Sequence, residues 1–153
     1  PRDTRMKRIA LILSSAVLVV VLTLTLWQNY DRGQAIEQAS QLMQEVTQAA
    51  LSDWDPAPVL ANAAVPTPEP MQEASMANVF NALRRLGELR QMGEVQMEVD
   101  IPPIWQTSRA ATAGFVTHAE FEYGNAEIRI TMERESGRWY FTSFRVLTSL
   151  LAA

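Results

Sequence analysis

An unbroken apolar run from Ile9 to Trp27 constrains this chain more than any other feature of its sequence. About 20 consecutive apolar residues form a helix long enough to cross the ~30 Å hydrocarbon core of a bilayer. The polar side chains within the run belong to serine and threonine, whose hydroxyl groups can bond back to their own helix. We therefore expect residues 9–28 to form a transmembrane anchor.

A secretory signal peptide starts in the same way, with a charged beginning and an apolar centre. That centre is usually roughly 7–15 residues long and ends at a cleavage site with small side chains. The run in this chain is longer, and it ends in Trp27-Gln28-Asn29-Tyr30, which offers no pair of small residues. Both features favour an anchor over a cleaved signal. A lipid-modified cysteine is excluded because the chain has no Cys.

The charges beside the run predict its orientation. Four basic residues precede it, against the single acid Asp3; they are Arg2, Arg5, Lys7 and Arg8. Short basic flanks stay on the cytoplasmic side of a membrane, and Trp and Tyr gather at its interfaces. We therefore expect residues 1–8 to be a cytoplasmic tail and residues 29–153 to lie in a bacterial periplasm, outside the inner membrane. Trp27 and Tyr30 fit the outer interface.

The part beyond the anchor is acidic. It holds nine of the 13 basic residues and 16 of the 17 acidic ones, a formal net charge of −7. Such a domain is repelled by nucleic acid and by anionic lipid, so neither is an expected partner. Without Cys and with one His, the chain offers no thiolate chemistry and no usual zinc site. We expect no metal and no cofactor.

Two amphipathic helices are predicted after the anchor. Residues 31–52 carry apolar side chains at alternating spacings of three and four, and Asp53-Trp54-Asp55-Pro56 ends that helix. A second helix is expected over residues 71–92, capped by Gly93. Residues 56–70 hold five prolines and form a semi-extended loop, which either crosses its own domain or wraps a neighbour. Gly33 either separates the first helix from the anchor or lets the two run on continuously.

From Glu94 onward the apolar period changes to two, which predicts four half-buried strands. They cover residues 95–101, 113–123, 126–133 and 139–148. Two-residue turns are predicted at Gly124-Asn125, which pairs Phe121 with Ile128, and at Ser136-Gly137, which places Met132 opposite Phe141.

The last predicted strand differs from the others because it is apolar on both faces. Trp139, Phe141 and Leu147 fall on one face, and Tyr140, Phe144 and Val146 on the other. This pattern predicts burial on both sides, or an exposed face that is used for binding.

The order of two helices and four strands is typical of an α+β fold. The segment Gly114–Val146, with the turn Tyr123-Gly124-Asn125-Ala126 and the run Glu133–Tyr140, resembles the cystatin-like or NTF2-like superfamily. The resemblance covers residues 33–149. It implies two amphipathic helices packed in the concavity of a curved four-stranded antiparallel sheet. Membrane-anchored domains of this kind occur in secretion systems.

Three functions are compatible with this layout, and the first is favoured. It is a non-catalytic accessory or scaffold subunit of an inner-membrane complex of electron-transfer, photosynthetic or secretion type, with other integral membrane subunits and the lipid bilayer as partners. The anchor residues expected to touch a partner helix are Leu11, Leu13, Val17, Val20, Leu24 and Trp27. Candidate partner contacts of the exported domain are Trp54, Pro66, Pro68, Ile104 and Trp105.

The other two functions follow from the resemblance. One is a tethered pocket for a small apolar ligand, lined by Phe115, Phe121, Trp139 and Phe141. The other is a small enzyme of isomerase or hydratase type, because enzymes of the NTF2-like group set an Asp or His with Tyr inside the cone. Its candidates here are His118, Asp100, Tyr123 and Tyr140. No glycine-rich phosphate loop, nucleophile elbow or metal-ligand spacing is present, so we expect no catalytic residues.

Overall fold

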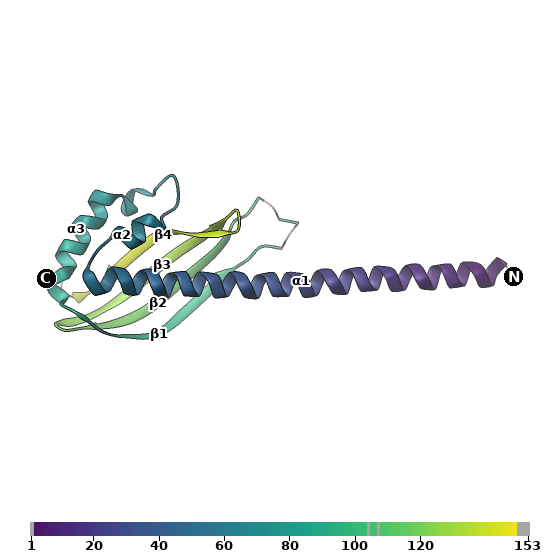
Figure 1. Ribbon diagram of the computed structural model, residues 1–153, viewed down its shortest axis with the longest axis horizontal. Coiled ribbons are helices and arrows are strands. Elements are labelled where there is room, and N and C mark those ends of the chain that lie inside the picture. The colour runs from purple at the N-terminus through teal and green to yellow at the C-terminus, as the bar shows by residue number, and fades with distance from the viewer. Residues whose placement is uncertain (1, 104, 107, 150–153) are drawn as a thin grey trace. The chain divides into compact units, whose positions relative to one another are not determined.

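The computed structural model describes residues 2–103, 105–106 and 108–149. The chain divides into two compact units, residues 1–37 and 38–153. The predicted α+β layout is confirmed, with a long apolar N-terminal helix and a four-stranded antiparallel sheet (Figure 1). In chain order the elements are α1 (Arg2–Asp53), α2 (Ala57–Ala61), η1 (Glu69–Met71), α3 (Glu73–Leu83), η2 (Arg84–Leu86), β1 (Leu89–Asp100), β2 (Ala111–Phe121), β3 (Gly124–Glu135) and β4 (Arg138–Leu147).

The first unit is helical throughout its described residues. α1 begins at Arg2 and continues without a break through Gly33, so the predicted anchor and the first amphipathic helix are one element. Every side chain from Arg2 to Trp27 is exposed. The hydroxyl groups of the run donate to carbonyl groups three or four residues earlier, as expected for polar side chains inside an apolar helix; they belong to Ser14, Ser15, Thr23 and Thr25.

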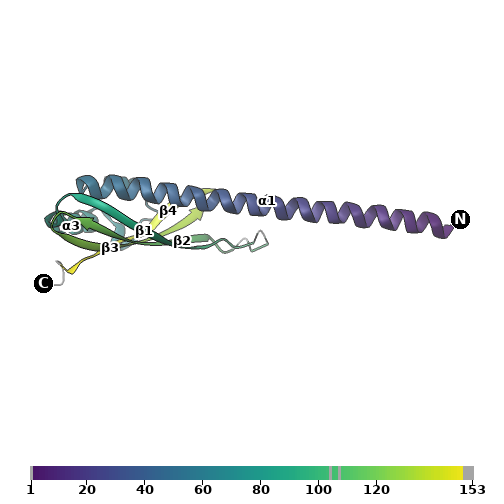
Figure 2. The same cartoon turned by 90° about the horizontal axis from the view of Figure 1, so that it is seen from below.

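The second unit is built on a sheet with the strand order β1-β2-β3-β4. The part of α1 from Gln38 onward lies over one face of this sheet (Figures 1 and 2). The sheet is uncurled, so the curved sheet that the resemblance implies is not found. Alternate residues of β2 and β3 are buried on the face toward α1, as the period of two predicted.

α1 ends in a tight turn centred on Trp54. Trp54 has a φ of 51°, a left-handed conformation that is usually taken by Gly, and the N–H of Asp55 donates to the carbonyl of Ala50 at 3.0 Å. The indole ring is buried, lies 5.1 Å from the ring of Phe121, and donates through Nε1 to the carbonyl of Gly87 at 2.8 Å. Packing of the ring thus outweighs the ~1–2 kcal/mol that a side chain costs in this conformation.

The predicted second helix is too long at its C-terminal end. α3 ends at Leu83, η2 follows, and β1 begins at Leu89. The half-buried residues Leu89, Met92 and Val95 lie three apart because the pairing of β1 with β2 is irregular between them. Bulges therefore give the start of this strand a spacing that resembles a helix. Gly87, not Gly93, is the residue with positive φ after the helical segment.

The predicted turn at Gly124-Asn125 is wrong by two residues. Phe121 pairs with Gly124, so Glu122 and Tyr123 form the turn, and Ile128 pairs with Thr117 instead of Phe121. Backbone bonds from another segment hold the turn, because the N–H groups of Glu122 and Tyr123 donate to the carbonyls of residues 88 and 86. A shift of two residues keeps every side chain on its predicted face.

The second predicted turn is confirmed. Ser136 and Gly137 both have positive φ, and Met132 pairs with Phe141. Beyond that point a bulge changes the phase of β4, because Thr131 pairs with Ser143 and leaves Thr142 as the extra residue.

The bulge in β4 turns one aromatic and one aliphatic side chain toward the core. Phe144 and Val146 are buried together with Trp139 and Phe141. Tyr140 stays half-buried and Leu147 is exposed. The prediction that β4 is apolar on both faces is therefore wrong, and its apolar residues form mainly one inner face.

Two glycines with nearly the same φ give a matched test of packing around η2. Gly87 (φ +78°, ψ −155°) is in a region that only Gly adopts readily, and an added Cβ would lie 2.9 Å from Glu122 Cβ and from Tyr123 Cδ2. Gly137 (φ +79°) has nothing within 4 Å. We expect Gly137→Ala to lower the free energy of unfolding by about 1 kcal/mol. Gly87→Ala should lower it by about 3 kcal/mol, because strain and a clash add.

Urea unfolding of the full chain in mild detergent, followed by far-ultraviolet circular dichroism, measures both values. Equal losses for the two variants would show that Glu122 and Tyr123 do not confine Gly87.

Candidate functional site

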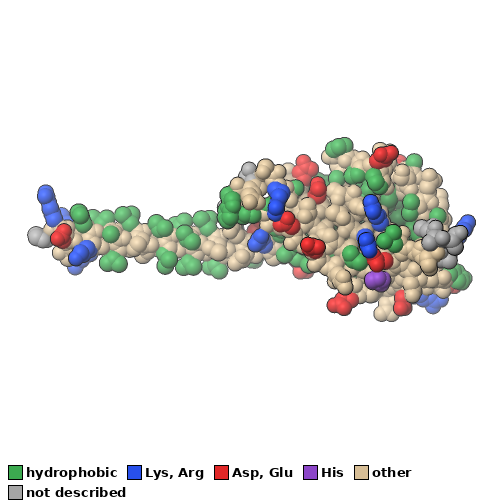
Figure 3. All heavy atoms as spheres, turned by 180° about the vertical axis from the view of Figure 1, so that it is seen from behind, with side chains coloured by type: hydrophobic (Ala, Val, Ile, Leu, Met, Phe, Trp, Pro, Cys, Tyr) green, Lys and Arg blue, Asp and Glu red, His purple; other side chains and the backbone are tan. Residues whose placement is uncertain are grey.

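The apolar run Ile9–Trp27 is the largest exposed apolar surface of the first unit (Figure 3). The six predicted anchor contacts are all exposed, from 46% for Leu24 to 68% for Leu11. At about 100° per residue, the 4-3-4-3 spacing of five of them makes one stripe. The stripe consists of Leu13, Val17, Val20, Leu24 and Trp27, and it is called the anchor stripe below. Leu11 lies on another side of the helix.

Among the described residues, α1 is the one helix long and apolar enough to cross a membrane. Its length and composition fit a membrane anchor and also a signal sequence. The exposed apolar surface requires a non-aqueous neighbour in either case, because soluble monomers rarely expose contiguous apolar patches beyond a few hundred Å².

The predicted partner contacts of the domain separate into three groups. Trp54 is a core residue, since its ring is 6% exposed and also lies 6.1 Å from the ring of Phe80. Pro66 and Trp105 are exposed and Pro68 is half-buried. Ile104 lies outside the described residues.

The predicted pocket residues belong to the core. Phe115, Phe121, Trp139 and Phe141 are each at most 5% exposed. The backbone of Phe141 is covered on its outer edge, because its N–H donates to the carbonyl of residue 62 at 2.7 Å and its carbonyl accepts from the N–H of residue 64 at 2.9 Å. Strand β4 is thus paired on both sides at this point, and its large side chains fill the inner face of the sheet.

The four residues that an isomerase-type site would need are not brought together. His118 is exposed on the face away from α1, with Nε2 3.4 Å from an oxygen of Glu127. Asp100 is paired with Arg109, Tyr123 is exposed in the β2–β3 turn, and the Tyr140 ring lies under the guanidinium of residue 138. Asp100 pairs across the sheet with residue 112, six positions along β2 from His118. Within the described part of the chain, no three potential metal ligands cluster.

The outer face of the sheet carries a shallow hollow of about 410 Å³ that our sequence reasoning missed. Gly114, one of the residues that line it, pairs with Glu98 on one side and Thr131 on the other. An added Cβ at Gly114 would meet only the carbonyl of Glu98, at 3.9 Å. The signal was a glycine inside a strand, which often marks a close approach. The residues lining the hollow are Gln96, Met97, Glu98, Gly114, Phe115, Val116, Arg129, Ile130 and Thr131.

Glu127 contacts two side chains beside the hollow. Its carboxylate contacts His118 and is hydrogen-bonded by Nε of Arg129. Figure 3, seen from behind Figure 1, shows acidic and basic side chains interspersed over the domain. Such a surface can hydrogen-bond a partner's side chain.

Between β1 and β2, the structure describes the loop residues 101–103, 105–106 and 108–110. Arg109 closes the base of this loop by donating to both carboxylate oxygens of Asp100, at 2.9 and 2.8 Å. The N–H of Gln106 donates to the carbonyl of Pro103 at 2.9 Å, and Trp105 is in a turn conformation. The Trp105 side chain is 75% exposed.

No protein-family model, no curated protein and no solved structure matches this chain. Its function therefore has to follow from its own surfaces.

Proposed function

We propose that the protein is a membrane-anchored, non-catalytic accessory subunit of a bacterial inner-membrane complex of electron-transfer, photosynthetic or secretion type. The observation that carries the proposal is the exposure of every side chain of the run Ile9–Trp27. This surface is compatible with the apolar interior of a bilayer. The backbone hydrogen bonds lie within the helix, and hydroxyl groups of the run donate to carbonyls of the same helix, so these polar groups need no water. The lack of a small-residue cleavage site after Trp27 favours retention of the helix.

The side chains on the surface and in the core of the domain support the accessory role. Two carboxylates that could serve in acid–base chemistry form surface ion pairs instead, Asp100 with Arg109 and Glu127 with Arg129. His118 also contacts Glu127. The large aromatic side chains fill the core rather than line a cavity. The order of helices and strands supports placing the domain among cystatin-like or NTF2-like folds, with an uncurled variant of their sheet.

Partner subunits would contact this protein both within the bilayer and outside it. Within the bilayer, the anchor stripe presents a regular seam to a neighbouring transmembrane helix, where close van der Waals packing drives association. Outside the bilayer, Pro66 is exposed and Pro68 is half-buried, and their rings restrict the backbone of a bent surface segment.

The decisive test is co-purification from native membranes after mild detergent extraction. We expect a stable set of membrane proteins to accompany the full chain. A stripe variant (Leu13→Ala, Val17→Ala, Val20→Ala, Leu24→Ala) should stay in the membrane but lose these partners. The matched control changes four apolar residues on the other side of the helix (Ile12→Ala, Val19→Ala, Leu22→Ala, Leu26→Ala) and should keep them. A monodisperse monomer without partners would contradict the proposal.

The orientation of the anchor gives a further prediction. A reporter enzyme active only in the periplasm, fused after residue 149, should be active. Replacing Arg5, Lys7 and Arg8 by Glu removes the basic flank that holds the N-terminus inside. We expect this variant to lose most reporter activity, while replacing the same residues by other basic residues should leave it unchanged. Equal activity in both variants would show that the basic flank does not set the orientation.

A further inference from the structure

The two edges of the sheet differ in what covers them. β4, at one edge, is bridged at Phe141 by the segment around Ala63, which forms backbone hydrogen bonds with that residue. Among the described strands, β1 at the other edge pairs with β2 alone (Figure 1). Within the described residues, no backbone bond joins residues 89–100 to a segment outside the sheet. One side of β1 therefore presents unpaired N–H and C=O groups, which can pair with a further strand.

The regular part of this free edge is residues 95–100. It contains no Pro, and the irregularities in the pairing of β1 lie before it. Val95, Met97 and Val99 pair with residues of the buried face of β2, yet none of the three is itself buried, and Met97 is 44% exposed. A strand beside β1 would cover these apolar side chains, because side chains of neighbouring strands pack against each other on each face.

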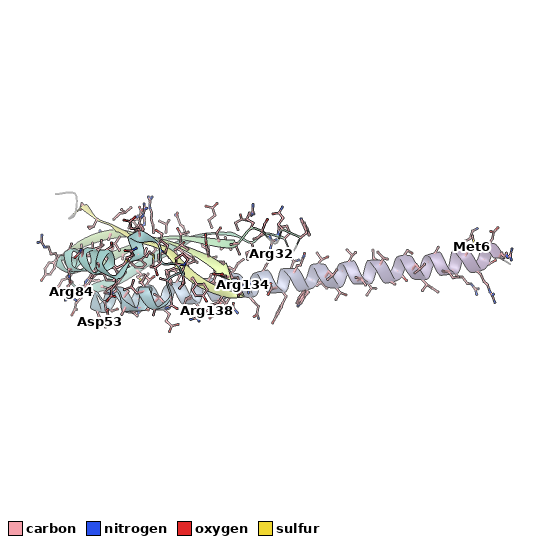
Figure 4. All side chains as sticks on the ribbon, turned by 90° about the horizontal axis from the view of Figure 1, so that it is seen from above. Met6, Arg32, Asp53, Arg84, Arg134 and Arg138 are labelled. Atoms are coloured by element: carbon pink, nitrogen blue, oxygen red, sulfur yellow. The ribbon has the colours of Figure 1, made fainter. Side chains whose placement is uncertain are left out.

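The opposite face of the same edge is acidic. Glu94 and Glu98 are exposed, and no ion pair forms at either carboxylate within the described part of the chain. Figure 4 shows where three arginines of the domain lie, with Arg84 at one end of the sheet, and Arg134 and Arg138 at the other, beside the β3–β4 turn. Opposite charges on facing strands stabilise a pair, so the two carboxylates favour a strand with basic side chains.

The hollow on the outer face begins at this edge. Two of its lining residues, Gln96 and Glu98, belong to β1, and Gly114 of β2 lies across from Glu98 without a side chain. A long Lys or Arg side chain of an added strand can therefore extend into the hollow, with its charge near the Glu98 carboxylate. The hollow thus favours long basic side chains over short ones.

A second copy of this chain does not fit the edge. When two identical strands pair antiparallel about a two-fold axis, the residue on the axis faces itself. With residue 98 on the axis, Glu98 would face its own copy, and with residue 99 there, it would face Asp100. With residue 96 or 97 on the axis, Glu94 would face Glu98 or Asp100. Like charges directly opposite each other are destabilising, so each of these registers is disfavoured.

We infer that the free edge of β1 binds an extended segment of a partner protein as a fifth strand, and that basic and apolar side chains alternate along this segment. Backbone hydrogen bonds along residues 95–100 attach the segment, as in other cases of strand addition. Its basic side chains meet Glu94 and Glu98, and its apolar side chains cover Met97. The inference rests on the accessory role proposed above and names the chemistry of the segment that a partner would contribute.

A synthetic peptide tests the inference on the full chain in mild detergent. The probe is the seven-residue peptide Lys-Val-Lys-Val-Lys-Val-Lys, and hydrogen–deuterium exchange followed by mass spectrometry measures the protection of residues 91–99. We expect the peptide to slow exchange there and to leave residues 138–147 of β4 unchanged, because an added strand takes up N–H groups of β1. A control peptide of the same composition, with four Lys followed by three Val, should give no protection.

Charge-reversal variants separate strand addition from a general attraction to an acidic domain. The variant Glu94→Lys/Glu98→Lys should bind the alternating peptide roughly tenfold more weakly, because two favourable charge pairs become repulsive. It should instead bind the peptide in which Glu replaces each Lys. The matched control Glu120→Lys/Glu133→Lys makes the same change in net charge at exposed residues of β2 and β3, and should keep wild-type affinity. Fluorescence anisotropy of labelled peptides measures all these affinities.

Equal loss of affinity in the two variants, or protection by the block peptide, would overturn the inference, because charge alone would then explain the binding. Protection of residues 91–99 that rises with protein concentration in the absence of peptide would also overturn it and assign the edge to a second copy. If the full chain keeps its partners in the co-purification test but binds no alternating peptide, the accessory role stands and the edge inference fails. Peptide binding at β1 without any co-purifying partner would support the edge inference and contradict the accessory role.

Discussion

Replacing Leu18 and Val19 together by Arg is expected to release the protein from the membrane. Both residues lie at the centre of the apolar run, and both side chains are exposed. Each Arg costs ~2.5–3.5 kcal/mol at the centre of a membrane-spanning helix, and each loses the favourable term of the residue that it replaces. The pair should therefore shift insertion by about 6 kcal/mol or more. The fraction of protein that remains in the pellet after alkaline carbonate extraction measures the effect.

Two controls separate charge from position. Leu18→Ala with Val19→Ala shortens the side chains without adding charge, and the protein should stay in the pellet. Gln28→Arg with Asn29→Arg adds the same two charges just beyond the run, where the side chains can reach the interface, and should also leave the protein in the pellet. Extraction of the wild-type chain itself by carbonate would rule out the anchor.

Replacing Trp54 by Ala is expected to be the most damaging single change in the domain. The ring packs against Phe80 and Phe121, and its Nε1 satisfies the carbonyl of Gly87. Truncation of a buried Trp costs ~3–5 kcal/mol, a large share of the ~5–15 kcal/mol that stabilises a typical domain. Urea unfolding of the full chain in mild detergent should show this loss as a lower transition midpoint.

The left-handed backbone of residue 54 makes a second substitution informative. Trp54→Gly loses the same ring as Trp54→Ala but removes the strain of a Cβ at φ 51°. We therefore expect Trp54→Gly to be more stable than Trp54→Ala by about 1 kcal/mol. Trp105→Ala, which removes an exposed indole, should stay within about 0.5 kcal/mol of the wild type. A Gly variant less stable than the Ala variant would show that residue 54 is not strained.

The sequence predicted those features that depend on neighbours along the chain. The apolar run, the period of two in β2 and β3 and the turn at Ser136-Gly137 are local patterns, and the structure has them where they were expected. The turn between β2 and β3 was missed because backbone bonds from residues 86 and 88, far away in the sequence, select its position. A local turn preference for Gly124-Asn125 is worth less than two satisfied backbone hydrogen bonds in a packed end of the sheet.

The candidate surfaces divide in the same way. The anchor stripe follows from helix spacing alone, apart from Leu11. Trp54 and Trp105 are both tryptophans beside prolines in loops, and nothing local distinguishes the buried one from the exposed one. Their burial depends on which other segments come near. Gly87 and Phe121 contact Trp54, whereas the Trp105 side chain is 75% exposed.

By itself the sequence determined an apolar helix long enough to cross a membrane, an acidic α+β domain behind it, and alternating strands that bury one face. These follow from hydrophobicity and from side-chain period, which are properties of adjacent residues. Only the tertiary structure decided the bulges that give β1 a helix-like spacing and turn Phe144 and Val146 inward. The physical reason is that strand pairing and core packing balance hydrogen bonds and contacts between segments that are distant along the chain.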